Sequence, residues 1–389
     1  MGGGRKIFQK NKLSLNELPK KINLNKGIVV IYNKSTEFGG TQVKNFLGKI
    51  DYIIKRYGKA CKAISIRFDI FNPKDKLSYI LFEYIIYTLL KEFHQNIYVY
   101  APKVENSIQT EGVQNSLLKE WICRAITKDR FLNQFGNRIK QTNFRRIIEP
   151  NDNLAVSTLM TDIKSYLKFF YIDRDDSSKI SEIISELADN ACEHAKSQCL
   201  IDIDVSEKPY YKDDDDSTLY YSVNLCVLNF SDIYLGDTIK EKVENKKYRN
   251  SARYEKLKRA FEIHKQFFNE DYNEKKFFML AAFQNRISGR TNETETGGKG
   301  LSQLIRELED KAESHNCYVM SGKDVIIFRP EFLEFDDDGW IGFNNNNNFL
   351  NERPDKKVIK FSDTFLNGTA YNLTLIYRRL DDEKKQDYS

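Results

Sequence analysis

The first part of the chain alternates short β-branched runs with stretches of helical periodicity. Apolar residues at i, i+3, i+4 and i+7 predict amphipathic helices after the turn Gly39-Gly40-Thr41 and from Asp75 to about Phe93. β-Branched and aromatic runs predict strands at residues 27–32, 63–68 and 96–101. This βαβαβ order predicts a small parallel or mixed sheet with helices packed on it. Residues from about 109 to 170 follow with a mainly helical pattern and basic patches around Arg138 to Arg146.

The second part begins with a helix predicted at about 178–196. An alternating strand at 200–205 and a strand at 219–228 would pair as a hairpin around an acidic turn, 213–216. A long charged helical stretch follows from about Thr238 to Phe283, and then a Gly/Thr-rich loop enters a helix that starts at Leu301. Three strands are predicted to end the domain, at residues 318–320, 324–328 and 370–377. We interpret the Asn344–Asn348 run before the last strand as a tolerated surface insertion.

Composition narrows the class of protein only a little. The chain has 389 residues, 40% of them apolar, which suits roughly two or three packed domains. The 61 Lys and Arg residues against 56 Asp and Glu give a net charge of +5, so nucleic acid stays open as a partner but is not indicated. No apolar run approaches the ~20 residues of a membrane-spanning helix, and the N-terminus lacks the apolar core of a signal peptide. We therefore expect a soluble, cytoplasmic protein without a membrane partner.

The six cysteines are widely spaced and form no C-x-x-C pair. Free buried thiols are the expected state, because a zinc site needs more ligands at tighter spacing.

The segment Ser185-Glu-Leu-Ala-Asp-Asn-Ala-Cys-Glu-His-Ala195 carries the most informative chemistry. On a helix, Glu186, Asn190 and His194 are spaced at i, i+4 and i+8 and form one polar stripe. A carboxylate, a carboxamide and an imidazole in line can position a water, a hard cation and a phosphate. A solvated helix face is the ordinary interpretation of such a stripe when it stands alone.

A second informative segment is Thr294-Glu-Thr-Gly-Gly-Lys-Gly-Leu301, before a helix. Glycines let the backbone approach phosphates closely, and a helix N-terminus adds exposed N–H groups and a positive dipole end. Lys299 could add a direct charge. The order is not that of a P-loop, because Lys299 is followed by Gly300.

Together these segments resemble the GHKL, or Bergerat-fold, ATPases, which include gyrase, heat-shock chaperones, mismatch-repair ATPases and histidine kinases. Residues 186–195 resemble the family's N box. The resemblance implies that Glu186 is the general base, that Asn190 is the Mg²⁺ ligand, that Asp189 supports the site and that His194 approaches the phosphates. It covers roughly residues 150–380 and implies ATP and magnesium as cofactors.

Two further segments extend the resemblance. Residues 297–301 resemble the G2 box, in which the ATP lid meets the next helix, and they contribute Gly297, Gly298, Lys299, Gly300 and Leu301 to the expected nucleotide site. The segment Phe365-Leu-Asn-Gly-Thr369 resembles the family's closing Gly-Thr turn near the adenine, which brings in Thr369.

The family's G1 box, Asp-x-Gly-x-Gly, is altered here. The equivalent positions are Asn229, Ser231 and Ile233. An Asn carbonyl can still accept the adenine N–H, but without the charge, and Asp232 is an alternative acceptor. Asn229 and Ser231 are accordingly candidate nucleotide contacts. Residues from about 235 to 296 would form the lid, in which Arg290 is the leading phosphate contact among the basic residues Lys246, Lys247, Arg253, Arg286 and Arg290.

The domain organisation expected is a polar lead-in at 1–26, a small α/β domain with a helical connector at 27–135, a GHKL-type domain at 136–380 and a charged tail at 381–389. The small domain resembles a STAS module in its order of elements, and an unrelated α/β packing domain is the alternative. The GHKL-type part would be an α/β sandwich with helices on one face of a mixed sheet.

The leading hypothesis is a Mg²⁺-dependent ATPase that acts as a nucleotide-controlled switch on a partner protein. The alternatives are a serine/threonine protein kinase of the anti-sigma type and a non-catalytic module with a degenerate pocket. Histidine autophosphorylation is not expected, because none of the four histidines suits a phosphoacceptor helix. Analogy at the level of the fold ranks bacterial regulation or anti-phage defence first, and a homodimer stays open.

Overall fold

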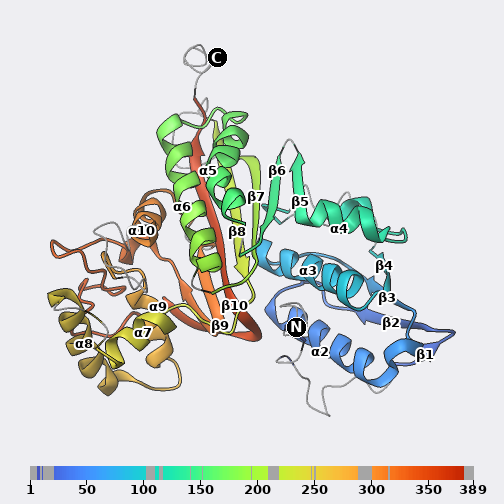
Figure 1. Ribbon diagram of the computed structural model, residues 1–389, viewed down its shortest axis with the longest axis horizontal. Coiled ribbons are helices and arrows are strands. Elements are labelled where there is room, and N and C mark those ends of the chain that lie inside the picture. The colour runs from blue at the N-terminus through green and yellow to red at the C-terminus, as the bar shows by residue number, and fades with distance from the viewer. Residues whose placement is uncertain are drawn as a thin grey trace.

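The computed structural model describes residues 7–8, 11, 22–101, 110–113, 117–140, 142–150, 152–193, 195–208, 219–246, 248, 251–287, 300–313 and 316–380. These residues form two sheets with helices packed between and beside them (Figure 1). Within these ranges, no helix has both the length and the apolar character that crossing a bilayer requires.

The N-terminal sheet has four strands in the order β1-β2-β3-β4. β2, β3 and β4 are parallel, and β1 pairs antiparallel with β2 at the edge. The sheet is therefore mixed, and the last residues of the expected lead-in already belong to it. The strands are β1 (Leu24–Asn25), β2 (Ile28–Asn33), β3 (Ala63–Phe68) and β4 (Asn96–Tyr100).

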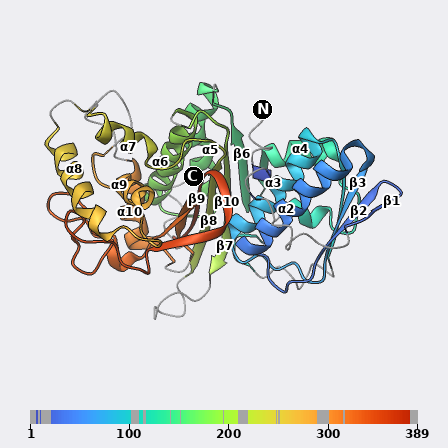
Figure 2. The ribbon, with the colours of Figure 1, turned by 90° about the horizontal axis from the view of Figure 1, so that it is seen from below.

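The two helices that connect the parallel strands are α2 (Gly40–Tyr57) and α3 (Lys76–Glu92). Figure 2 shows both on the same side of the N-terminal sheet, between it and the second sheet. This arrangement follows from right-handed crossovers between strands in sequential order. The expected amphipathic character of α3 is wrong, because every residue from Lys76 to Leu90 is buried. A helix enclosed between two sheets has no solvent face, and its sequence is accordingly apolar almost all round.

The second sheet has six strands in the order β5-β6-β7-β8-β10-β9. All neighbouring pairs are antiparallel, so the expectation of a mixed sheet is wrong here. The cause is the connection from β6 to β7, which is a pair of helices, α5 (Asn153–Lys168) and α6 (Arg174–Glu193). A helical hairpin returns the chain to the end of the sheet that it left, and the next strand then runs antiparallel. The strands are β5 (Asn137–Lys140), β6 (Asn143–Ile148), β7 (Cys199–Lys208), β8 (Tyr220–Asn229), β9 (Tyr318–Ile327) and β10 (Ile359–Arg378).

Both faces of the six-stranded sheet are covered, which corrects the expectation that helices would cover one face. Alternate residues of the strands belong to different cores: Ile201, Val227 and Tyr371 pack with α6, whereas Leu200, Leu228 and Ala370 pack with α2 and α3. The N-terminal helices α2 and α3 therefore cover the face of the six-stranded sheet that α6 does not cover. Figure 2 shows the N-terminal unit and the α7–α10 region on opposite sides of this sheet.

Two further expectations need correction. The segment expected to be mainly helical, 109–170, does contain α4 (Lys128–Gly136) and α5, but it also contains the β5–β6 hairpin, whose Arg138 and Arg145 are held by ion pairs. The two strands expected at 318–320 and 324–328 are one continuous strand, β9. Gly322, with φ +67°, is accommodated within it as an irregularity of the β9–β10 pairing.

A buried ion network joins the two parts of the chain. Asp202 on β7 bonds both Lys76 of α3, at 2.5 Å, and Arg145 of β6, at 2.5 Å. Arg145 also reaches Glu83 of α3, at 2.6 Å, and these four side chains are at most 4% exposed. Burial opposes ionisation of Asp202, but Arg145 and Lys76 outweigh it and hold the pKa of this carboxyl at about 2. Burial raises the pKa of Glu83, which Arg145 opposes. With both carboxyls ionised the four charges sum to zero, which reduces the cost of enclosing them.

The segment between β8 and β9 contains α7 (Asp237–Glu244), α8 (Ala252–His264), α9 (Glu274–Ala281) and α10 (Gly300–Lys311). His264 is fully buried there. Its Nε2 donates to the carbonyl of Phe349 at 2.7 Å, because that oxygen can only accept, and its Nδ1 then accepts from the Tyr272 hydroxyl at 2.7 Å. Phe349 directly follows the Asn344–Asn348 run. Within that run Asn347 accepts from the Gly342 N–H at 2.7 Å, whereas Asn345 and Asn346 are exposed, so the run lies at the surface as expected.

Short 3-10 helices complete the described elements, at Gly58–Ala60, Leu117–Glu120, Lys265–Phe267 and Pro330–Phe332.

Replacing Asp202 with Ala should cost about 3–5 kcal/mol of unfolding free energy, because Lys76 and Arg145 would keep their charges in a dry interior. Urea denaturation measures this loss. The control is Glu262→Ala, which removes a partner of Lys265 from a pair whose side chains are 50% and 57% exposed, and should cost at most about 1 kcal/mol. Equal losses in the two variants would contradict the role given to the network.

His264 should make the fold sensitive to mild acid. Burial lowers the pKa of this histidine from 6.5 to about 4. Its stabilising effect is therefore complete above pH ~6.5 and is lost as the pH falls from ~6.5 to ~4, by roughly 3 kcal/mol. The difference in unfolding free energy between wild type and His264→Gln should shrink over that pH range. A difference that stays constant with pH would contradict the assignment.

Candidate functional site

A cavity opens between α6, the end of β8, the middle of β10, and the region of α7 and α10. The enclosed cavity volume is about 110 Å³, and the space widens towards an open mouth. Five of the residues expected from the sequence line it, although they come from four separate segments: Glu186, Asn190, Asn229, Leu301 and Thr369.

The wall from α6 carries the polar stripe. Glu186 and Asn190 lie one helical turn apart, and both line the cavity and are half-buried. On the same helix Ile183, Ile184 and Ala188 are buried in the core. This division of α6 into a core side and a cavity side fixes the direction of the carboxylate and the carboxamide. Asp189, half-buried on the same helix, does not line the cavity.

At the floor of the cavity, the segment that was compared with the G1 box, at the end of β8, meets the segment 365–369 of β10. Asn229, at the end of β8, accepts a hydrogen bond through Oδ1 from the Thr369 N–H at 2.7 Å. The preceding residue, Gly368, has φ +144°, and a Cβ there would lie 2.1 Å from the Asn229 carbonyl oxygen. Only glycine allows this approach. The expected turn at 365–369 is an irregular part of β10 rather than a turn before it, since the pairing register shifts between Phe361 and Thr369.

Ser231 supports the site from outside. Its hydroxyl donates to the Ala195 carbonyl at 2.8 Å and accepts from the Ile233 N–H at 3.0 Å. It thereby ties the segment after α6 to the segment after β8, and it does not line the cavity. Asp232 is exposed, accepts from the Asn367 amide at 3.2 Å, and is likewise outside the lining.

The roof consists of residues that the motifs did not single out. Leu235 and Gly236 lead into α7, Thr238 and Ile239 lie in its first turn, and Ala282 and Ile287 follow α9. Gly236 has φ +92°, and a Cβ there would lie 2.5 Å from the Phe278 carbonyl carbon. A glycine directly before a helical pattern was the available signal for this turn.

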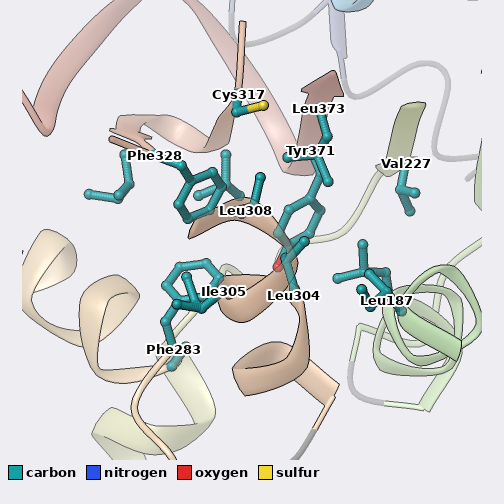
Figure 3. Close-up of a cluster of buried hydrophobic side chains, with 14 of the residues drawn as sticks. Leu187, Val227, Phe283, Leu304, Ile305, Leu308, Cys317, Phe328, Tyr371 and Leu373 are labelled. Carbon is teal, nitrogen blue, oxygen red and sulfur yellow. The ribbon is translucent and has the colours of Figure 1, made fainter. Parts of the chain in front are cut away.

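Behind the cavity lies the core that holds its walls in place. Figure 3 shows Tyr371 of β10 between Val227 and Leu187 on one side and Leu304, Ile305 and Leu308 of α10 on the other. Tyr371, Val227 and Leu187 also line the cavity. One end of the cavity is therefore apolar, and the end beside Glu186 and Asn190 is polar.

The basic residues proposed for phosphate contact are placed as follows. Lys246, Arg253 and Arg286 do not line the cavity. Arg253 lies over the Trp340 ring, 4.0 Å from its centroid, and donates to the carbonyls of Asp338 and Gly339 at 2.7 and 2.6 Å. Its role is structural. Residues that lie outside the described ranges are His194, Lys247, Arg290, Gly297, Gly298 and Lys299.

Gly300 begins α10, so the N-terminus of this helix lies next to the cavity-lining Leu301. Backbone N–H groups at a helix N-terminus favour an anion in general. No group of three or more His, Cys, Asp or Glu residues in the described ranges could hold a metal ion by itself. Magnesium usually takes only one or two protein oxygens and completes its shell with water and substrate phosphates. Asn190 Oδ1 and the Glu186 carboxylate fit such a hard-ligand requirement.

The cysteines behave as expected. All six are free, and all except Cys123 are buried. Burial, with Asp189 nearby, raises the pKa of Cys192 to about 11, which makes it an unreactive thiol.

No family model, curated protein or solved structure matches the chain.

Replacing Gly368 with Ala should destabilise the protein by roughly 2–4 kcal/mol, because the new Cβ would collide with the Asn229 backbone. Thermal unfolding measures the effect. Gly136→Ala is the matched control, since a Cβ there meets nothing within 4 Å, and it should be neutral or stabilising by up to about 1 kcal/mol. A Gly368→Ala protein as stable as wild type would contradict the described contact.

Proposed function

We propose that the chain is a Mg²⁺-dependent ATPase of the GHKL type that acts as a nucleotide-controlled switch on a partner protein. The observation that carries this proposal is the convergence of Glu186, Asn190, Asn229, Leu301 and Thr369 on one cavity. The motifs quoted from the sequence are far apart along the chain, and a chance resemblance would not be expected to bring them around a common cavity.

The cavity's chemistry supports the assignment of its two ends. The apolar end, against Val227 and Tyr371, suits a flat heterocycle. The opposite end offers Glu186, Asn190 and the N-terminus of α10, which suit phosphates. The N-terminus of α7, entered through Gly236, adds backbone N–H groups at the roof.

In this proposal, Glu186 orients a water and accepts its proton as the water attacks the terminal phosphorus. Asn190 contributes an amide oxygen to the magnesium shell. Magnesium, when bound, would offset the negative charge that develops on the phosphates during transfer. The backbone at the start of α10 holds the phosphates in place. The α7–α9 region forms the roof, so closure over a bound nucleotide gives two states that a partner protein can distinguish.

The test replaces Glu186 with Ala. Nucleotide binding should persist, and turnover should fall by at least about 100-fold, because the water loses its base. Release of phosphate under saturating ATP and magnesium measures this. Glu182→Ala is the control, since Glu182 lies one turn earlier on α6, is exposed and does not line the cavity. Its turnover should equal that of wild type.

If Glu186→Ala keeps full turnover, Glu186 is not the base and the mechanism fails. Label from [γ-³²P]ATP that appears on a protein rather than as free phosphate would favour the anti-sigma-type kinase. Absence of nucleotide binding in wild type would favour the non-catalytic module, which the altered G1 segment would then explain.

A further inference from the structure

Asn229 is the most deeply buried polar side chain at the apolar end of the cavity. It is 5% exposed and is flanked in the lining by Val227 and Tyr371, which are 3% and 7% exposed. If a heterocycle of a ligand fills this end, the polar atoms on its ring edge therefore face the Asn229 amide. Since the surroundings are apolar, a ring atom that cannot hydrogen-bond with this amide would be left without a partner.

The orientation of this amide is set by its backbone partner. The Thr369 N–H can only donate, and at 2.7 Å it is bonded to Asn229 Oδ1. The opposite atom of the amide is then Nδ2, which has no hydrogen-bond partner among the described residues. The Thr369 hydroxyl does not take that place, because it is bonded to the Ser321 hydroxyl at 2.9 Å. Asn229 thus presents an N–H donor to the cavity.

A hydrogen-bond donor at this position selects a different heterocycle from the one that a carboxylate would select. A carboxylate only accepts, so it favours a 6-aminopurine and repels a 6-oxopurine. An amide nitrogen only donates, so it matches the oxygen at position 6 of guanine or hypoxanthine. We propose that Asn229 makes this site accept 6-oxopurine nucleoside triphosphates at least as well as ATP. This inference rests on the proposed nucleotide site and specifies the base that the site takes.

The experiment compares ATP with ITP on the full chain, in the presence of magnesium, by equilibrium dissociation constants. The two nucleotides differ only at position 6 of the purine and in the proton on N1. Wild type should bind ITP as tightly as ATP or more tightly. Asn229→Asp should shift the ratio towards ATP by about tenfold or more, because the carboxylate would accept from the 6-amino group and repel the 6-oxo group.

Asn224→Asp is the matched control. It makes the same change of charge on β8, at a buried residue that does not line this cavity, and should leave the ratio unchanged. A wild type that binds ATP more than tenfold better than ITP would overturn the inference while leaving the ATPase proposal in place. That comparison uses wild type alone, so it tests the inference even if Asn229→Asp does not fold. An equal shift in Asn224→Asp would also overturn it. Binding of neither nucleotide would instead overturn the nucleotide site itself.

Discussion

The buried ion network around Asp202 is the constraint on which the architecture depends. The charges of Lys76, Arg145, Glu83 and Asp202 cancel in a space that water does not reach. A single unpaired member would be costly, so α3 must sit against β6 and β7 in one position. This pins the N-terminal unit to the six-stranded sheet and leaves the sheet's other face for α6, α10 and the cavity.

The rigidity of the cavity follows from that arrangement. β10 contributes Thr369 to the floor of the cavity, and the N-terminal part contacts β10 both before and after Thr369 in the strand. Asn11 bonds the Phe365 backbone through both its Nδ2, at 2.7 Å, and its Oδ1, at 2.8 Å. Farther along the strand, Asn372 accepts from the Leu77 N–H of α3 at 2.9 Å. Sites that need precise geometry are best carried on such rigid elements. A partner that displaced the N-terminal unit would loosen the floor, which offers a physical route between partner contact and nucleotide.

The sequence was sufficient to predict features that depend on residues close together in the chain. The i, i+4 spacing of Glu186 and Asn190 was sufficient to place both on one side of α6, and the parallel strands of the N-terminal sheet lie where their β-branched runs predict them. The sequence was not sufficient for features that depend on contacts between residues far apart in the chain. In the alternating strand β7, Asp202 has the pattern of a solvent-facing residue, yet it is 1% exposed because Lys76 and Arg145 neutralise it. The meeting of Asn229 with Thr369 depends on Gly368, whose role is visible only once the strands are paired. The α7 residues of the roof lie in a segment whose charged helices carry no motif.

The central claim is that Asn190 and its neighbours form a magnesium-dependent nucleotide site. The most direct measurement is the thermal stability of wild type and Asn190→Ala with ATP, titrated with Mg²⁺. Ligand at about 100 times its Kd should stabilise wild type by about 2.7 kcal/mol, and Asn190→Ala should lose the magnesium-dependent part of that gain. No stabilisation of wild type, or an identical magnesium response in Asn190→Ala, would contradict the account.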